Sequence, residues 1–104
     1  MEETNMLTIE KNRQGAELTV MLNGKLDTAS APDFEAVVKN DLAGVETLVL
    51  EFKDLKYTSS AGLRVILLAQ KTMNQQGNMI LKNVSEDIVE VFEMTGLADL
   101  LTIE

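Results

Sequence analysis

Two adjacent serines, Ser59 and Ser60, are the residues of this chain whose type and position best suit chemistry. They lie at a predicted strand-to-helix turn, just before an apolar segment that runs from Leu63 to Leu68. The free N–H groups and the dipole at the start of a helix favour an anion. A serine at this place can therefore accept a phosphate, which adds a switchable negative charge. The simpler alternative is an ordinary N-cap serine.

Catalysis by these serines is disfavoured, because the sequence has neither histidine nor cysteine. Histidine is the usual base beside a nucleophilic serine, and histidine and cysteine are the common ligands of transition metals. Lys53 or Lys56 could in principle act as the base, since serine–lysine pairs exist. Gly62 stands alone and forms no glycine-rich phosphate loop. We therefore expect a protein that is not an enzyme and that has no cofactor or metal.

The composition indicates one globular domain, residues 1–104, with a modest core, because 45% of the residues are hydrophobic. The formal net charge is −8, from 17 acidic and 9 basic side chains. A surface this acidic repels nucleic-acid phosphates, so direct binding to nucleic acid is not expected. The same charge either serves solubility alone or steers the protein toward a basic partner.

The N-terminal residues 1–5 are acidic and polar, without the basic and apolar parts of an export signal. The longest apolar run, residues 63–69, contains Arg64 and is far shorter than the roughly 20 residues that span a bilayer. We therefore expect a soluble, cytoplasmic protein that has no membrane partner.

Strand-like patterns recur along the chain as alternating or β-branched apolar residues. The clearest is the alternation of Leu18, Val20 and Leu22, which predicts a strand with one buried face. A turn is expected over residues 12–15, and a bend or bulge at Asn23 and Gly24. The predicted strands are residues 6–11, 17–23, 45–52 and 79–84.

Helical patterns separate these strands. Ser30 is expected to cap a helix whose apolar stripe is Phe34, Val37, Val38 and Leu42. A second helix is predicted over residues 60–75, with a covered first half and an exposed second half that includes Gln70. Ser85 is expected to cap a third helix, which ends at Gly96 before a short closing turn.

Strands that alternate with helices predict a mixed sheet flanked by helices. A right-handed crossover through helix 60–75 would make strands 45–52 and 79–84 parallel. Binding sites in such open sheets gather at the carboxyl ends of the strands. Asp27 follows strand 17–23 and Ser60 follows strand 45–52, so both residues are expected at that edge.

Three segments of the chain resemble the STAS domain family, named after sulfate transporters and anti-sigma factor antagonists. Residues 22–27 match its early Gly-x-Leu-Asp element, residues 54–63 its phosphorylation loop, and residues 92–97 a late signature that ends at Gly-Leu. Together they are similar to a stand-alone bacterial anti-sigma factor antagonist. This resemblance implies an α/β fold with a mixed four- to five-stranded sheet, in the order β-β-α-β-α-β-α with a short final helix.

The resemblance also implies a switch between protein partners. In this family the unphosphorylated antagonist binds an anti-sigma factor that is also a serine kinase, and so frees a sigma factor that directs transcription. Phosphorylation of one loop serine abolishes binding, and a serine phosphatase restores it. The phosphorylated serine lies two residues before the loop glycine, here Gly62, which gives Ser60. We expect the protein to be a monomer.

Further site residues come from the same resemblance, in which the family's early aspartate, implicated in kinase contact, corresponds to Asp27. Many members carry aspartate where this chain has Ser59 and a hydroxyl where it has Ala61, so Ser59 is the second candidate for phosphorylation. Arg64 follows Ser60 by four positions, near enough to pair with a phosphate if it points that way. The expected partner-binding residues are Asp27, Thr58, Ser59, Ser60, Ala61, Gly62 and Arg64. The alternative function is a STAS scaffold subunit, not phosphorylated, in a transport or stress-sensing complex.

Overall fold

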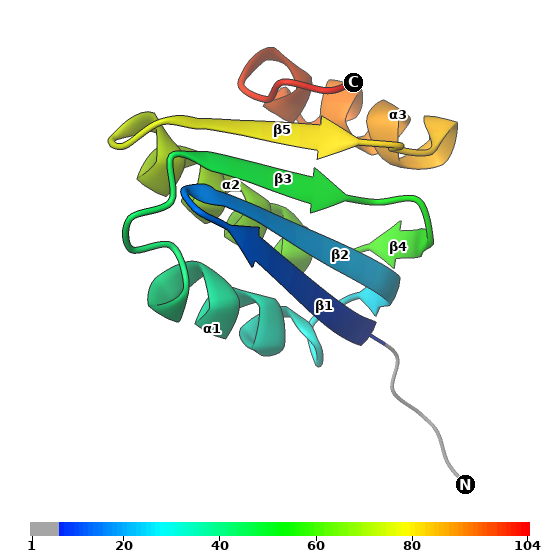
Figure 1. Cartoon of the computed structure of the whole chain (residues 1–104). Coiled ribbons are helices and arrows are strands. Elements are labelled where there is room, and N and C mark those ends of the chain that lie inside the picture. Colours follow the sequence, from blue (N-terminus) through cyan, green and yellow to red (C-terminus); the bar gives the residue numbers. More distant parts are fainter. Residues whose placement is uncertain (1–6) are drawn as a thin grey trace, which may run out of the picture.

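The computed structural model describes residues 7–104, which form a mixed sheet with helices on one face (Figure 1). The strands of this part of the chain are β1 (Leu7–Gln14), β2 (Glu17–Leu26), β3 (Thr47–Glu51), β4 (Leu55–Thr58) and β5 (Asn78–Lys82). Its helices are α1 (Ala31–Asn40), α2 (Ser60–Asn74), α3 (Glu86–Met94) and the short 3-10 helix η1 (Leu97–Asp99). The predicted α/β class and the order of the elements are confirmed, with β4 as the fifth strand.

Strand β2 lies at the centre of the sheet that positions the site. Strand β1 pairs with it antiparallel along one edge, with Gln14 opposite Glu17. On its other edge β3 pairs in parallel with residues 17–21, and β4 then pairs in parallel with residues 24–26. Strand β5 is parallel to β3, as the crossover through helix 60–75 predicts. The parallel strands therefore end at a common edge, from which α1 and α2 begin.

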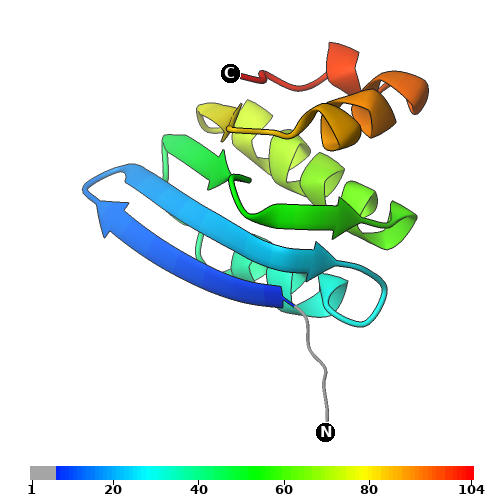
Figure 2. The ribbon, with the colours of Figure 1, turned by 90° about the vertical axis from the view of Figure 1, so that its right-hand side faces the viewer.

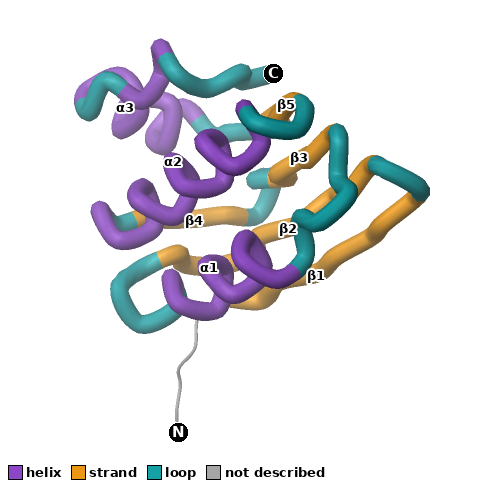
Figure 3. Tube along the Cα trace, turned by 90° about the vertical axis from the view of Figure 1, so that its left-hand side faces the viewer, coloured by secondary structure: helices purple, strands orange, loops and turns teal. Residues whose placement is uncertain are grey.

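Helices α1 and α2 pack on the same face of the sheet, as Figures 2 and 3 show from opposite sides. The predicted alternation in β2 is confirmed, because Leu18, Val20 and Leu22 are buried in the core beneath these helices. Helix α3 lies on the β5 side of α2, and its Phe92 ring centroid is 6.4 Å from that of Phe52. The side chains beneath α1, α2 and α3 therefore belong to one hydrophobic core.

The turn predicted over residues 12–15 is wrong, because Asn12, Arg13 and Gln14 continue β1. A two-residue loop of Gly15 and Ala16 connects the strands instead. Gly15 has φ 62°, which suits the first position of a tight hairpin turn that only glycine adopts easily. Met6, predicted to start this strand, lies outside the described residues. The bulge expected at Gly24 is confirmed by a register shift between Gly24 and Lys25.

The predicted strand 45–52 corresponds to β3 alone, and the strand that leads into α2 is β4. Ser60 therefore follows β4 and not the strand 45–52. Gln70 was expected on an exposed surface, but only 7% of it is exposed, because its spacing from Leu63 and Ile66 places it on the buried face of α2. Leu42 is buried as predicted, although α1 ends two residues earlier, at Asn40.

Candidate functional site

The ends of β2 and β4 bring the two predicted loops together. Leu26 pairs with Thr58 in the sheet, and the backbone N–H of Ser59 donates to the carbonyl oxygen of Leu26 at 2.8 Å. Asp27 and Ser59, which immediately follow these paired residues, are therefore neighbours at one edge. The expectation that the aspartate loop and the serine turn share this edge is met.

The two serines differ in what they present to solvent. Ser59 is the N-cap residue of α2, with extended backbone (φ −95°, ψ 176°), and its Oγ is buried without a hydrogen-bond partner among the described residues. Ser60 is the first residue of α2 and is exposed. A reagent or protein that approaches this helix start can therefore reach the side chain of Ser60, whereas that of Ser59 faces inward.

Gly62 and Thr58 are buried beneath this turn. A β-carbon placed on Gly62 would lie 2.6 Å from Cγ of Leu26, closer than such atoms approach in proteins. Thr58 is only 7% exposed. Both residues therefore position the first turn of α2 against β2 and β4, and they offer little surface to a partner.

Asp27 organises the loop between β2 and α1. Its Oδ1 accepts hydrogen bonds from the backbone N–H groups of Ala29 and Ser30, each at 3.0 Å, and lies 3.1 Å from the Ser30 hydroxyl. The backbone hydrogen bond from Ser30 is the main cause that lowers the pKa of the Asp27 carboxyl, and the Ser30 hydroxyl, Ala29 and Lys25 act in the same direction. Asp27 is therefore held ionised by its own loop.

Ser30 was predicted to cap α1 with its side chain, and this prediction is wrong. Ser30 does occupy the N-cap position, but its hydroxyl makes no capping bond to the helix. Instead it donates to the Lys25 carbonyl oxygen at 2.8 Å and accepts from the backbone N–H of Asp27 at 2.9 Å. The serine is used to close the loop that carries Asp27.

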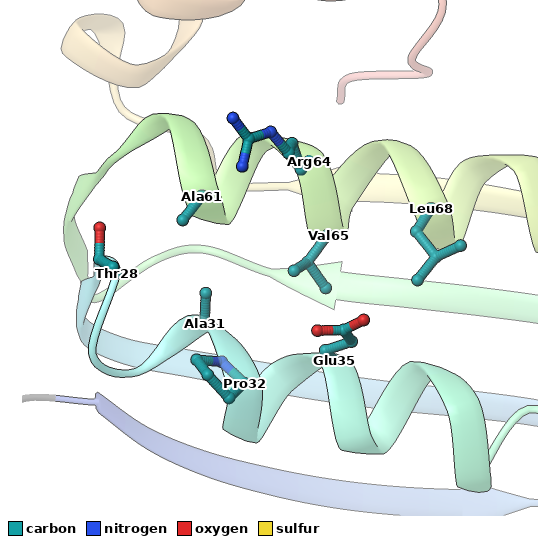
Figure 4. A pocket seen from close by; sticks show the side chains of 8 residues that line it. All are labelled: Thr28, Ala31, Pro32, Glu35, Ala61, Arg64, Val65 and Leu68. Carbon is teal, nitrogen blue, oxygen red and sulfur yellow. The ribbon is translucent and has the colours of Figure 1, made fainter.

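A groove of about 350 Å³ separates the first turns of α1 and α2. Figure 4 shows its two walls, with Ala61, Arg64, Val65 and Leu68 from α2. Facing them are residues that the sequence analysis did not single out: Thr28, Ala31, Pro32 and Glu35. The signal that could have found them is topological, because α1 and α2 both start at the carboxyl ends of parallel strands.

Residues 7–104 were also expected to lack a lysine base for the serines and a metal-binding cluster, and the positions of their side chains bear on both expectations. Lys53 and Lys56 are exposed, whereas a lysine that acts as a base is normally buried. Within the same range, no three acidic, histidine or cysteine side chains gather where they could hold a metal ion. No described helix is long and apolar enough to cross a membrane. Two exposed hydroxyl groups lie near this groove, that of Thr28 in its wall and that of Ser60 at the start of α2.

Known proteins are similar to this chain in sequence and in fold. The family model of the STAS domain matches residues 8–104. BtrV of Bordetella bronchiseptica is 35% identical over 83% of this chain and 76% of its own length. The anti-sigma-B factor antagonist of Staphylococcus aureus is 30% identical over 91% of this chain and 90% of its own. The structure of the Bacillus cell fate determinant SpoIIAA in its phosphorylated form superposes with a TM-score of 0.75 at 21% identity, over 93% of this chain and 91% of that one.

Proposed function

Because the chain belongs to the STAS domain family, we propose that it is an anti-sigma factor antagonist controlled by phosphorylation of Ser60. The unphosphorylated form binds an anti-sigma factor that is also a serine kinase, and a sigma factor is released. Phosphorylation ends this binding, and a serine phosphatase restores it. The names of the relatives support the antagonist role, and a phosphorylated form of the structural neighbour SpoIIAA supports the switch.

The observation that carries this proposal is the exposure of Ser60 at the start of α2, beside a loop with a fixed carboxylate. The helix start tolerates a phosphate in the free protein, because its N–H groups and dipole favour negative charge. Ser59 is less suited as the acceptor, because its Oγ is buried. Ser60 therefore remains the first candidate and Ser59 the second.

The surface around Ser60 explains why one modification can decide binding. Ala61 and Ala31 give the groove small side chains, so that a partner can approach the backbone of both helix starts closely. A phosphate on Ser60 adds three oxygens and about two negative charges where the partner would seat. Burying that charge without compensation costs several kcal/mol, which is enough to abolish a complex of modest affinity.

The seven partner-binding residues divide into two roles in this proposal. Ser60, Ala61 and Arg64 contact the partner, because they lie on the surface or line the groove. Asp27 contacts the kinase and also orders its loop. Thr58, Ser59 and Gly62 act by holding the turn in place. The protein acts as a regulatory binding protein and not as an enzyme.

The test is capture from a lysate of the source organism with four baits: the unmodified chain, Ser60→Ala, Ser60→Asp and Ser85→Asp. Ser85 is the matched control, because it also stands at a helix start and aspartate is a good N-cap there. We expect a serine-kinase ATPase with the unmodified chain, Ser60→Ala and Ser85→Asp, but not with Ser60→Asp. Circular dichroism should give all four baits the same fold.

Three outcomes would contradict the proposal. Capture of the same partners by all four baits would make Ser60 an ordinary surface serine and favour a scaffold that is not phosphorylated. Transporter subunits in place of a kinase would also favour that scaffold. A Ser60→Asp chain that has lost its fold would show that the added charge acts on folding, which would contradict a switch at the surface.

A further inference from the structure

We propose that Arg64 binds the phosphate carried by Ser60, so that the charge of the phosphorylated state is compensated within the chain. The proposal rests on the proposed function in one respect, namely that Ser60 carries the phosphate. Arg64 thus has a second role besides contacting the partner from the groove wall.

The helix geometry brings the two side chains together. Ser60 is the first residue of α2 and Arg64 lies one turn later, and both are exposed. Residues at positions i and i+4 have β-carbons about 5–6 Å apart on one face of a helix. Side chains of a helix also tilt toward its N-terminus, so a long side chain at position 64 extends back over position 60. Figure 4 shows the guanidinium of Arg64 directed back toward the start of α2.

The order of the charges is the favourable one. An anion at position i with a cation at i+4 stabilises a helix more than the reverse order, because it also agrees with the dipole. The five N–H groups of a guanidinium suit the oxygens of a phosphate, to which they can donate in pairs.

Arg64 is also free to take up this partner. Within residues 7–104 it forms no salt bridge, and the carboxylate across the groove is already engaged. That carboxylate belongs to Glu35, whose Oε2 lies 3.0 Å from Nζ of Lys39. Among the described residues, a phosphate on Ser60 therefore need not displace an ion pair to engage Arg64.

This pairing has a consequence for regulation. Arg64 lines the groove between α1 and α2, so a phosphate that engages its guanidinium withdraws a cation from that wall. Phosphorylation then changes the binding surface in two ways, by the added anion and by the loss of a free arginine. In the free domain the new charge then has the Arg64 guanidinium as a partner in addition to the N–H groups and dipole of the helix start.

The experiment uses the full chain with phosphoserine installed at position 60 by genetic-code expansion, so that no kinase is needed. The phosphorus-31 chemical shift is followed through a pH titration for the parent chain and for Arg64→Ala, Arg64→Lys and Lys71→Ala. Lys71 is the matched control, because it is an exposed cation on the same helix but lies close to its other end. The second pKa of a phosphoserine is ordinarily near 6, and a nearby cation lowers it.

We expect Arg64→Ala to raise this pKa by roughly 0.2–0.4 unit relative to the parent chain. Arg64→Lys should retain part of the lowered value, since it keeps the charge without the fork of donors, and Lys71→Ala should leave it unchanged. An unchanged value in Arg64→Ala, or an equal shift in Lys71→Ala, would overturn the proposal. The titration is made on the free chain, so its failure is distinct from a failure of Ser60 to control partner binding.

Discussion

Gly62 lies so close to Thr58 that a β-carbon on the glycine would be 2.5 Å from the Oγ1 of the threonine. The same β-carbon would be 2.6 Å from Cγ of Leu26, which is fully buried in β2. The first turn of α2 therefore rests directly on the ends of β2 and β4. This close approach sets the position of Ser60, which lies two residues before the glycine.

Replacing Gly62 with alanine should lower the free energy of unfolding by about 1–3 kcal/mol, because the methyl group has no free space. The better helix propensity of alanine, at most about 1 kcal/mol, offsets only part of this cost. Urea denaturation measures the change, and Ser60→Ala in the same turn is the control that should stay within about 0.5 kcal/mol of the parent.

The double variant Gly62→Ala with Thr58→Ala tests the cause. It removes the Oγ1 that the new methyl group would meet, so it should be more stable than the sum of the two single changes predicts. Additive effects would mean that the cost of Gly62→Ala does not come from this contact.

Replacing the two N-cap serines Ser59 and Ser85 with alanine should have different effects on stability. The Ser85 hydroxyl accepts from the backbone N–H of Ile88 at 3.3 Å, whereas the Ser59 hydroxyl is buried with no partner among residues 7–104. Ser85→Ala should therefore cost about 1 kcal/mol, the usual loss of a side-chain cap. Ser59→Ala should be neutral or stabilising, because it removes a buried polar group that has no hydrogen bond.

Thermal unfolding of both variants at the same pH measures this difference directly. A loss of stability in Ser59→Ala as large as that in Ser85→Ala would show that the Ser59 hydroxyl caps α2 after all.

Features of the fold that depend on a short segment of the sequence could be predicted from that segment. The alternation of Leu18, Val20 and Leu22 is visible in the sequence because one face of β2 is buried and the other is not. The start of α3 was likewise predictable, since Ser85 caps its own helix in the expected way. The neighbouring positions of Asp27 and Ser59 followed from the rule that parallel strands end at one edge.

Features that depend on distant parts of the chain were not predictable in the same way. Strand β4 has only Leu55 and Thr58 buried, and it exists as a strand because it pairs with β2. Ser30 looked like a cap because the sequence does not reveal that Asp27 and Lys25 bind its hydroxyl. The groove forms only where the starts of α1 and α2 lie side by side, so the sequence of either segment alone does not predict it.

The depressed pKa of Asp27 predicts how acid acts on this loop. A carboxyl whose pKa is lower in the folded chain than its ordinary value of 3.8 contributes stability that is fully present above that value. The contribution is lost as the pH falls through the lowered folded pKa. Asp27→Asn should therefore be less stable than the parent chain at pH 6, and the difference should shrink as the pH falls below 3.8 and through the lowered folded pKa.

Urea denaturation at a series of pH values checks this convergence. Asp33→Asn is the control, because Asp33 is an exposed carboxylate in the first turn of α1 outside the Asp27 loop. A stability difference between Asp27→Asn and the parent that does not shrink as the pH falls from 6 to well below 3.8 would contradict the role of the ionised carboxylate.

Replacing either of two glutamines near the end of α2 with methionine should change the free energy of unfolding, but with different signs. Gln70 is buried, and its Oε1 has no hydrogen-bond partner among the described residues. Gln76 instead donates from Nε2 to the carbonyl oxygens of Leu42 and Val45, each at 2.6 Å, and so ties the loop after α1 to the end of α2.

Gln70→Met should be neutral or raise the free energy of unfolding by about 1 kcal/mol, because the apolar side chain has similar length and removes the unpaired oxygen. The substitution also removes the hydrogen bond from Nε2 of Gln70 to Oδ1 of Asn74, at 2.8 Å, which limits the gain in stability. Gln76→Met should lower the free energy of unfolding by about 1–2 kcal/mol. The Val45 carbonyl oxygen loses its side-chain donor, and the Leu42 carbonyl oxygen keeps only the backbone N–H of Val45. Urea denaturation distinguishes the two signs. A marked loss of stability in Gln70→Met would mean that the Gln70 oxygen has a partner in solution, most simply a bound water.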